Sequence, residues 1–228
     1  MIGKLPNVQV FPGSRMSAAD IADFGADHVV LATGSRWRRD GIGVVNMDPL
    51  ALPEALTPDD IFAGAPIHGP VVIFDDEHYF MGGALAEKLR TAGHEVTLVT
   101  PHATASSWTA MTDEQGFVQA RLLHLGVRLE LSTMLTGQSA DTADLACAYT
   151  GAPRSIPCGA LILVTGRLPV DDLHRDLAAL GITADRVGDC LQPSSIADAV
   201  HSAHRYARNF GSPPAGVLRR EIPSHRSV

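Results

Sequence analysis

The sequence predicts an α/β protein with mostly parallel sheets, in which one nucleotide-type domain is interrupted by a second. Apolar strand-like runs alternate with helix-like stretches along the chain, which is the order of βαβ units. Two runs, LATG at 31–34 and LVTG at 163–166, both end in Thr-Gly, and a βαβ pattern lies between them. Because the strands that contain these runs are continuously apolar, we expect them to be covered on both faces, as in a parallel sheet.

Local signals place the elements of the first 66 residues. Ser17 has the position of a helix N-cap, with Asp20 three residues later and Gly25 at the end of the helix, a pattern typical of a capping box. The other elements expected here are a strand at 8–11, a strand at 27–34, a loop at 35–56 and a short helix at 57–64.

A further unit begins at Pro70, and the first domain resumes near residue 160. The expected strands are 71–74, 94–100, 127–131, 144–151 and 160–166, and the expected helices are 82–93, 112–126 with Thr112 as its cap, and a long one that starts at Ser194 or Ser195. We therefore predict one domain made of 1–66 with 160–228, and an inserted domain at 67–159.

Composition excludes several classes of protein. The formal net charge is −7 and no long run of Lys or Arg occurs, so we expect no nucleic-acid partner. No apolar run approaches the roughly 18 residues of a membrane helix, and the N-terminus lacks the pattern of a signal peptide. We expect a cytoplasmic protein without a membrane partner. The three cysteines form no CxxC pair. We therefore expect that this chain alone binds neither a metal ion nor an iron–sulfur cluster through its cysteines.

The turn after the strand at 71–74 is unusual for a nucleotide-binding unit. Dinucleotide folds place glycines here so that backbone can approach a pyrophosphate, but this chain has Asp75, Asp76 and Glu77, followed only by Gly82 and Gly83. Two such charges 4 Å apart repel by about 1 kcal/mol even in water. We predict a solvated acidic turn and no NAD(P)H site, so that the inserted domain is a scaffold; a metal site at the three acids is the alternative.

Three segments resemble the flavoproteins that carry two dinucleotide-type domains. They are VVLATGSRW at 29–37, LILVTGRLP at 161–169 and RVGD at 186–189. The segment YFMGGALAEKLRTAGHEVTLVT at 79–100 narrows the resemblance to the C-terminal third of the trimethylamine, dimethylamine and histamine dehydrogenase family, which is more distantly related to dienoyl-CoA reductase. The resemblance covers essentially the whole chain. It implies two interleaved Rossmann-like domains of the FAD/NAD(P)-binding type.

The resemblance also implies cofactors and site residues. Family members hold FMN in a TIM barrel and a 4Fe-4S cluster, neither of which has a counterpart here, and they hold ADP in the nucleotide-type domains. A partial ADP or FAD site would then use Gly188 and Asp189 as contacts, with Gly34 and Gly166 shaping the two crossovers and a helix N-terminus aimed at phosphate. No catalytic residue is identified, because no Ser-His-Asp or Cys-His pattern occurs.

The expected N-terminal strand with its glycine turn would precede Met1, so we expect the first domain to be incomplete. The resemblance implies a partner polypeptide that bears the barrel and cluster, or self-association, with an electron-transferring flavoprotein as electron acceptor. Two alternatives stay open. One is a non-catalytic nucleotide-fold interaction module, and the other is a divergent NAD(P)H:flavin oxidoreductase of the dienoyl-CoA reductase type, which the acidic turn disfavours.

Overall fold

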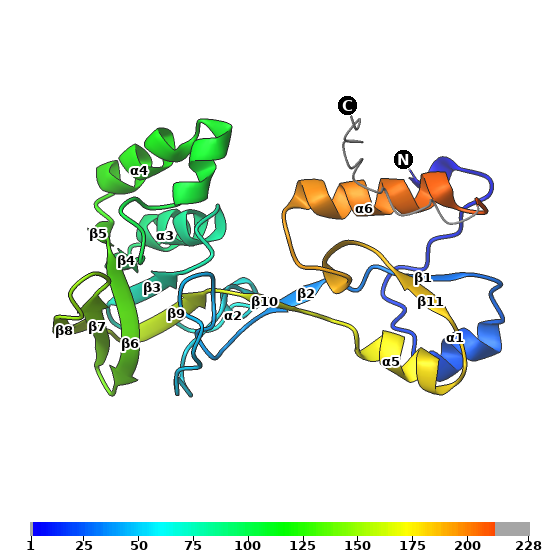
Figure 1. Cartoon of the computed structure of the whole chain (residues 1–228), viewed down its shortest axis with the longest axis horizontal. Helices are drawn as coiled ribbons and strands as arrows, with labels where there is room; N and C mark the ends of the chain where they lie inside the picture. Colours follow the sequence, from blue (N-terminus) through cyan, green and yellow to red (C-terminus); the bar gives the residue numbers. More distant parts are fainter. Residues whose placement is uncertain (1, 213–228) are drawn as a thin grey trace, which may run out of the picture. The chain divides into compact units, whose positions relative to one another are not determined.

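The computed structural model describes residues 2–212, and its chain forms two compact units (Figure 1). The first unit combines Met1–Ser35 with Pro169–Val228, and the second is Arg36–Leu168. The chain passes between them through two short paired strands, β2 (Ser35–Trp37) and β10 (Arg167–Pro169). Both units mix helices with parallel strands, so the predicted α/β class is confirmed.

The second unit is built on a four-stranded parallel sheet. Its order is β5 (Arg128–Glu130), β4 (Val96–Val99), β3 (Val71–Asp75) and β9 (Ala160–Val164). Every residue of β3 and β9 is buried, as continuous apolar runs predict. Alternate residues of β3 face opposite sides, so Ile73 packs with Leu85 in one cluster while Phe74 packs with Leu145 in another.

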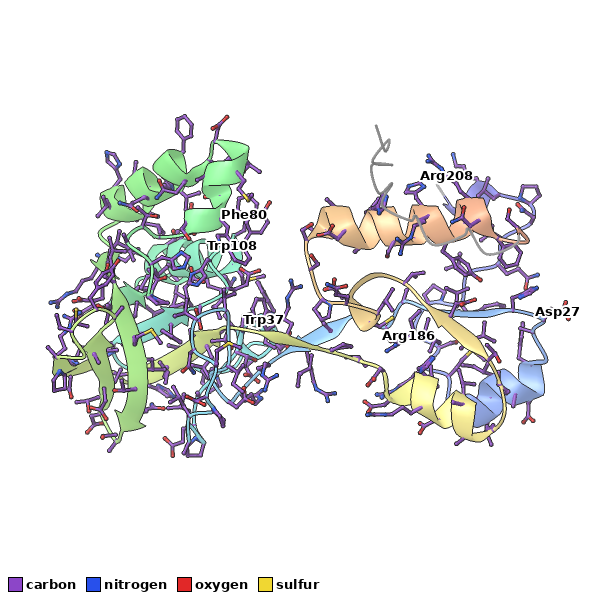
Figure 2. All side chains as sticks on the ribbon, viewed as in Figure 1. Asp27, Trp37, Phe80, Trp108, Arg186 and Arg208 are labelled. Atoms are coloured by element: carbon purple, nitrogen blue, oxygen red, sulfur yellow. The ribbon has the colours of Figure 1, made fainter. Side chains whose placement is uncertain are left out.

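Helices cover one face of this sheet and a second sheet covers the other (Figure 1). The helical layer consists of α3 (Met81–Thr91) and α4 (Gln115–His124), preceded by the 3-10 turn η2 (Ser107–Thr112). The other layer is an antiparallel sheet of β6 (Thr133–Ser139), β7 (Thr142–Cys147) and β8 (Pro153–Pro157). Both tryptophans, Trp37 and Trp108, belong to this second unit (Figure 2).

The boundary of the second unit differs from the predicted one. The sequence placed 1–66 in the first domain, but the contacts divide the chain between residues 35 and 36. The reason is that Leu56 pairs with β9, through Leu56 N–H to Leu161 O and Leu163 N–H to Leu56 O, both at 2.8 Å. The short helix α2 (Pro58–Phe62), which follows the expected cap Thr57, thereby packs against β9 of the four-stranded sheet.

The first unit has a two-stranded parallel sheet between helices. Strand β1 (Val29–Leu31) pairs with β11 (Ala184–Arg186); α1 (Ala18–Phe24) and α5 (Asp172–Ala179) lie on one side and α6 (Ile196–Asn209) on the other (Figure 1). Ala18, Leu31, Leu177 and Cys190 form its buried core. The prediction of a strand covered on both faces is wrong for β1, because Leu31 is buried but Val30 is 39% exposed.

Several local predictions were correct and others were not. The capping box of Ser17 and Asp20 and the left-handed Gly25 are present. No strand forms at 8–11; a 3-10 turn, η1, lies earlier at Ile2–Lys4. The predicted helix at 112–126 begins only at Gln115, because Asp113 is left-handed and ends η2. Strands β2, β6, β8, β10 and β11 and helix α5 were not predicted. Within 2–212, no helix is both long and apolar enough to cross a membrane.

Candidate functional site

The turn at Gly188 is held firmly between strand and helix. It follows β11 and opens the 3-10 turn η3 (Gly188–Cys190). Gly188 has φ +66°, a left-handed conformation that favours glycine, and its N–H donates to Ser202 Oγ on α6 at 2.7 Å. The buried Cys190 thiol donates to Leu31 O on β1 at 3.1 Å. The backbone here is therefore fixed relative to β1, β11 and α6.

Asp189 links the two chain segments that make up the first unit. Its Oδ2 accepts a hydrogen bond from Ser35 Oγ at 3.0 Å, and its Oδ1 accepts one from the N–H of Ser194 at 3.3 Å. Ser35 directly follows Gly34, whose carbonyl accepts from Val170 N–H at 3.0 Å. The structure thus brings together three of the predicted residues, Gly34, Gly188 and Asp189.

Gly166, the fourth predicted residue, belongs to the second unit. Its N–H donates to Ile42 O at 2.8 Å and its carbonyl accepts from Arg38 N–H at 2.9 Å. A Cβ at Gly166 would lie 2.9 Å from both Ile42 O and Arg38 Cδ. Its role in this structure is close backbone packing of the second unit.

The start of α6 already contains an anion. Of the two predicted caps, Ser194 and Ser195, the N-cap is Ser195, and its hydroxyl and the Asp198 carboxylate form a capping box. Hydrogen bonds from Ser194 and Ser195 lower the pKa of Asp198. The sequence predicted that this helix N-terminus points at phosphate. In the structure, carboxylates of the chain itself already lie at the N-terminus of α6, so a bound phosphate would share it with them.

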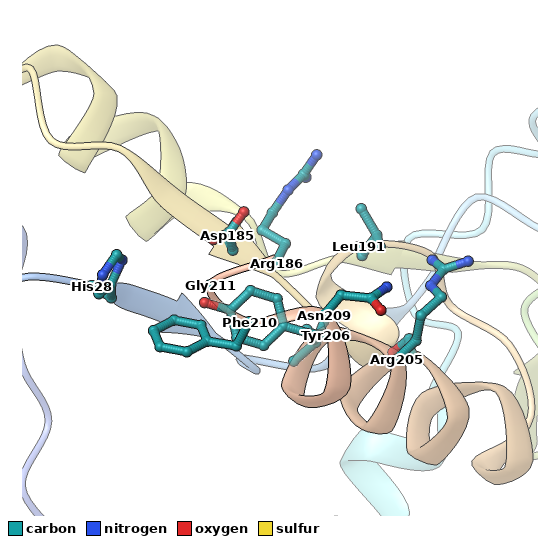
Figure 3. A pocket seen from close by; sticks show the side chains of 11 residues that line it. His28, Asp185, Arg186, Leu191, Arg205, Tyr206, Asn209, Phe210 and Gly211 are labelled. Carbon is teal, nitrogen blue, oxygen red and sulfur yellow. The ribbon is translucent and has the colours of Figure 1, made fainter. Parts of the chain in front are cut away.

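A groove of about 370 Å³ runs between α6 and the strands β1 and β11 (Figure 3). The rings of Tyr206 and Phe210 lie in it, with centroids 5.9 Å apart, and His28 packs edge-on against Phe210 at 4.8 Å. Partial desolvation and then the nearby Asp185 raise the pKa of Tyr206. The full lining is His28, Asp185, Arg186, Val187, Leu191, Ser202, Arg205, Tyr206, Asn209, Phe210 and Gly211.

The groove continues toward the Gly188 turn. A smaller hollow of about 220 Å³ shares Leu191, Ser202 and Arg205 with it and is also lined by Gly188. Arg205 therefore faces both spaces, and Arg186 Nη1 lies 3.8 Å from Asp171. Cationic and aromatic side chains next to a glycine turn can recognise phosphate and a flat ring. Sequence reasoning gave neither arginine a role: Arg186 was noted only as part of the RVGD segment, and only the fold places Arg205 beside Gly188.

The acidic turn at 75–77 is not the solvated turn that was predicted. Asp75 and Asp76 are completely buried. Asp76 accepts hydrogen bonds from the N–H groups of Val45 and Asn46, and its Oδ1 lies 3.0 Å from His78 Nε2 without the alignment of a hydrogen bond. Within the described residues no group of three His, Cys, Asp or Glu side chains could hold a metal ion.

The comparisons with known proteins agree with this architecture. A family model described as the OYE-like second alpha/beta domain matches residues 56–138. Dimethylamine dehydrogenase of Hyphomicrobium sp. (strain x) is 31% identical over 92% of this chain and 33% of that protein. The solved histamine dehydrogenase of Rhizobium sp. 4-9 is 39% identical with a TM-score of 0.91, over 97% of this chain and 37% of that one.

A second solved structure, the 6-hydroxypseudooxynicotine amine oxidase of Pseudomonas geniculata N1, is 32% identical with a TM-score of 0.88 over 92% of this chain and 33% of that one. The chain is thus homologous to dimethylamine dehydrogenase and histamine dehydrogenase, which are members of the trimethylamine dehydrogenase family. It spans about a third of the length of these relatives.

Proposed function

We propose that this chain is the C-terminal nucleotide-binding part of an amine-dehydrogenase-like flavoprotein oxidoreductase, and that its first unit binds ADP or the ADP half of FAD. The observation that carries the proposal is the groove of the first unit, in a homologue of the amine dehydrogenases. The groove and the adjoining hollow combine a left-handed glycine turn, two arginines and two aromatic rings, one on α6 and one directly after it. These are the groups that recognise an adenine nucleotide: guanidinium for phosphate and rings for the base.

The position of each group suggests how the nucleotide is held. Arg205 lines both the groove and the hollow at Gly188, so it would pair with a phosphate between the two spaces. Tyr206 near the end of α6 and Phe210 directly after it, whose ring planes are tilted by 55°, offer aromatic faces for the base. Asp189 would fix the turn through Ser35 and Ser194, and by family resemblance its carboxylate would accept a hydrogen bond from a ribose or ribityl hydroxyl.

The proposal includes a partner that carries the catalytic cofactors. The sheet of the first unit has only two described strands, and no residue of α6 is buried. Two apolar side chains of this helix are exposed: Ile196 at 86% and Val200 at 51%. Such an apolar helix face gains free energy when another chain segment covers it. By family resemblance that segment would belong to the part that holds FMN and a 4Fe-4S cluster, whose electrons would pass to an electron-transferring flavoprotein.

The test is calorimetric titration of the purified full chain with ADP. Asp189→Ala and Arg205→Gln should each weaken ADP binding by about tenfold, because each removes a charged or hydrogen-bonded contact. Arg208→Gln is the matched control for Arg205, since both are exposed on α6 and only Arg205 lines the groove. Asp23→Ala on α1 is the control for Asp189. Unchanged affinity in folded Arg205→Gln and Asp189→Ala would reject the site.

A further inference from the structure

The junction between β3 and α3 has the layout of an anion site. Strand β3 runs directly toward α3, whose first turn contains Gly82 and Gly83. The N-terminus of an α-helix carries about half a positive charge and unpaired N–H groups, which attract phosphate in many proteins. Here the space beside that turn is taken by acidic side chains of the chain itself.

Asp75 lies against the first turn of α3. A Cβ at Gly82 would come within 2.5 Å of Asp75 Oδ2, so only glycine allows the carboxylate to approach this closely. Asp75 Oδ1 accepts from the N–H groups of Glu77 and His78 at 3.3 and 3.0 Å. Asp75 Oδ2 is completely buried and has no hydrogen-bond partner among the described residues. A buried, unpartnered oxygen is therefore directed at the helix start, where an anion is expected.

Glu77 provides a second carboxylate at the same place. It accepts a hydrogen bond from the N–H of Tyr79 at 3.3 Å. Burial raises the pKa of Glu77, whereas Arg167 and the N–H groups of Tyr79 and Met81, the first residue of α3, act in the opposite direction. Arg167 Nη2 lies 4.0 Å from Glu77, and its guanidinium carbon is 5.3 Å from the centroid of the Trp37 ring. The Arg167 guanidinium, which could pair with a bound phosphate, thus lies next to the Glu77 carboxylate of the same chain.

Asp76 ties a segment of backbone to the same end of β3. Its carboxylate accepts from the N–H groups of Val45 at 3.0 Å and Asn46 at 2.8 Å, and its carbonyl accepts from Val44 N–H at 3.0 Å. A Cβ at Gly43 would lie 2.4 Å from Asp76 Oδ2. Residues 43–46 are therefore packed tightly at the carboxyl end of the strand, where ligands of open α/β sheets bind.

We propose that the start of α3 is an anion site of the phosphate-binding type that the chain fills with its own Asp75 and Glu77 carboxylates, so that pyrophosphate and dinucleotides are excluded from the second unit. This assigns a role to acids that a solvated turn would leave without one. It also explains the glycine at position 82, because a Cβ there would collide with the Asp75 carboxylate. The inference is independent of the nucleotide site proposed for the first unit.

The proposal predicts that the site opens when both carboxylates are removed. The variant Asp75→Gly/Glu77→Gln keeps an acceptor at 77 and frees Arg167 from its carboxylate. The matched control is Asp141→Gly/Glu87→Gln, which removes the same two charges from the same unit. Asp141 is exposed in the turn between β6 and β7, and Glu87 pairs with Arg121 at 2.9 Å, so the control also releases an arginine.

The probe is inorganic pyrophosphate, titrated into each full-length protein while hydrogen exchange of the amides at 81–84 is followed. The wild type and the control should show no pyrophosphate-dependent protection of these amides. The Asp75→Gly/Glu77→Gln variant should gain it, with an affinity about tenfold or more above the control.

Circular dichroism and tryptophan fluorescence establish that each variant is folded. A folded Asp75→Gly/Glu77→Gln protein that behaves like the control would overturn the proposal. So would protection of the 81–84 amides in the wild type, and this arm decides the question even if the variant does not fold. Because the readout is confined to α3, pyrophosphate bound in the first unit leaves it unchanged.

Discussion

Replacement of Asp75 by asparagine should stabilise the second unit at neutral pH. Burial raises the pKa of Asp75 from 3.8 to about 6, with the N–H of His78 acting in the opposite direction. One pKa unit corresponds to 1.36 kcal/mol, so the ionised carboxylate costs about 3 kcal/mol at pH 8. Asparagine removes the charge and keeps an oxygen that can accept from the N–H groups of Glu77 and His78. Its amide N–H has no obvious partner, which costs about 1–2 kcal/mol.

The pH dependence separates these two terms. A group whose folded pKa lies above its unfolded pKa binds more protons when folded, so its contribution to stability falls as the pH rises from about 4 to 6. The net gain of Asp75→Asn should be about 1–2 kcal/mol at pH 8 and should disappear or reverse at pH 4. The difference between the two values should be about 2.4 kcal/mol, because the amide term is common to both and the unfolded carboxyl is already partly ionised at pH 4.

The assay is urea unfolding monitored by tryptophan fluorescence, which reports on the second unit because Trp37 and Trp108 both belong to it. Asp141→Asn provides the control, since Asp141 is exposed and its change should leave the stability the same at both pH values. Equal effects of Asp75→Asn at pH 8 and pH 4 would refute the reasoning, because the carboxylate would then carry no burial cost.

Three further outcomes follow from the structure. Gly82→Ala should destabilise the second unit by about 2 kcal/mol or more, because its Cβ would collide with a buried carboxylate, whereas Gly116→Ala on the exposed side of α4 should stabilise it slightly; urea unfolding compares the two. Ser195→Ala should cost about 1 kcal/mol through loss of the α6 cap, measured by hydrogen exchange of the α6 amides. Cys147, whose pKa is lowered by hydrogen bonds from Thr150, should react with a thiol reagent well before Cys158, whose burial raises its pKa to about 11; timed labelling followed by mass spectrometry orders the two.

Much of the fold could be predicted because its signals are local. The capping box of Ser17 and Asp20 lies within four residues and forms as predicted, and Ser195 is one of the two residues predicted to cap the last helix. Strands β3 and β9 are apolar throughout and buried throughout. Strands β6 and β8 were missed because they are partly polar and depend on each other through β7.

The candidate sites depend on contacts between residues that are distant in the sequence. The hydrogen bond between Ser35 and Asp189 and those between Asp76 and residues 45–46 join separate segments of the chain. A sequence of three acids alone gives no sign that two of them are buried, because their partners are backbone N–H groups, which every residue carries. Arg205 was missed for the same reason, because only helix packing brings it beside Gly188.

The most direct test of the nucleotide-binding role is native mass spectrometry of the purified full chain with added ADP. The account predicts one ADP bound per chain, and loss of that species in Asp189→Ala but not in Asp23→Ala. A wild-type chain that remains free of ADP at concentrations that saturate a micromolar site would contradict it.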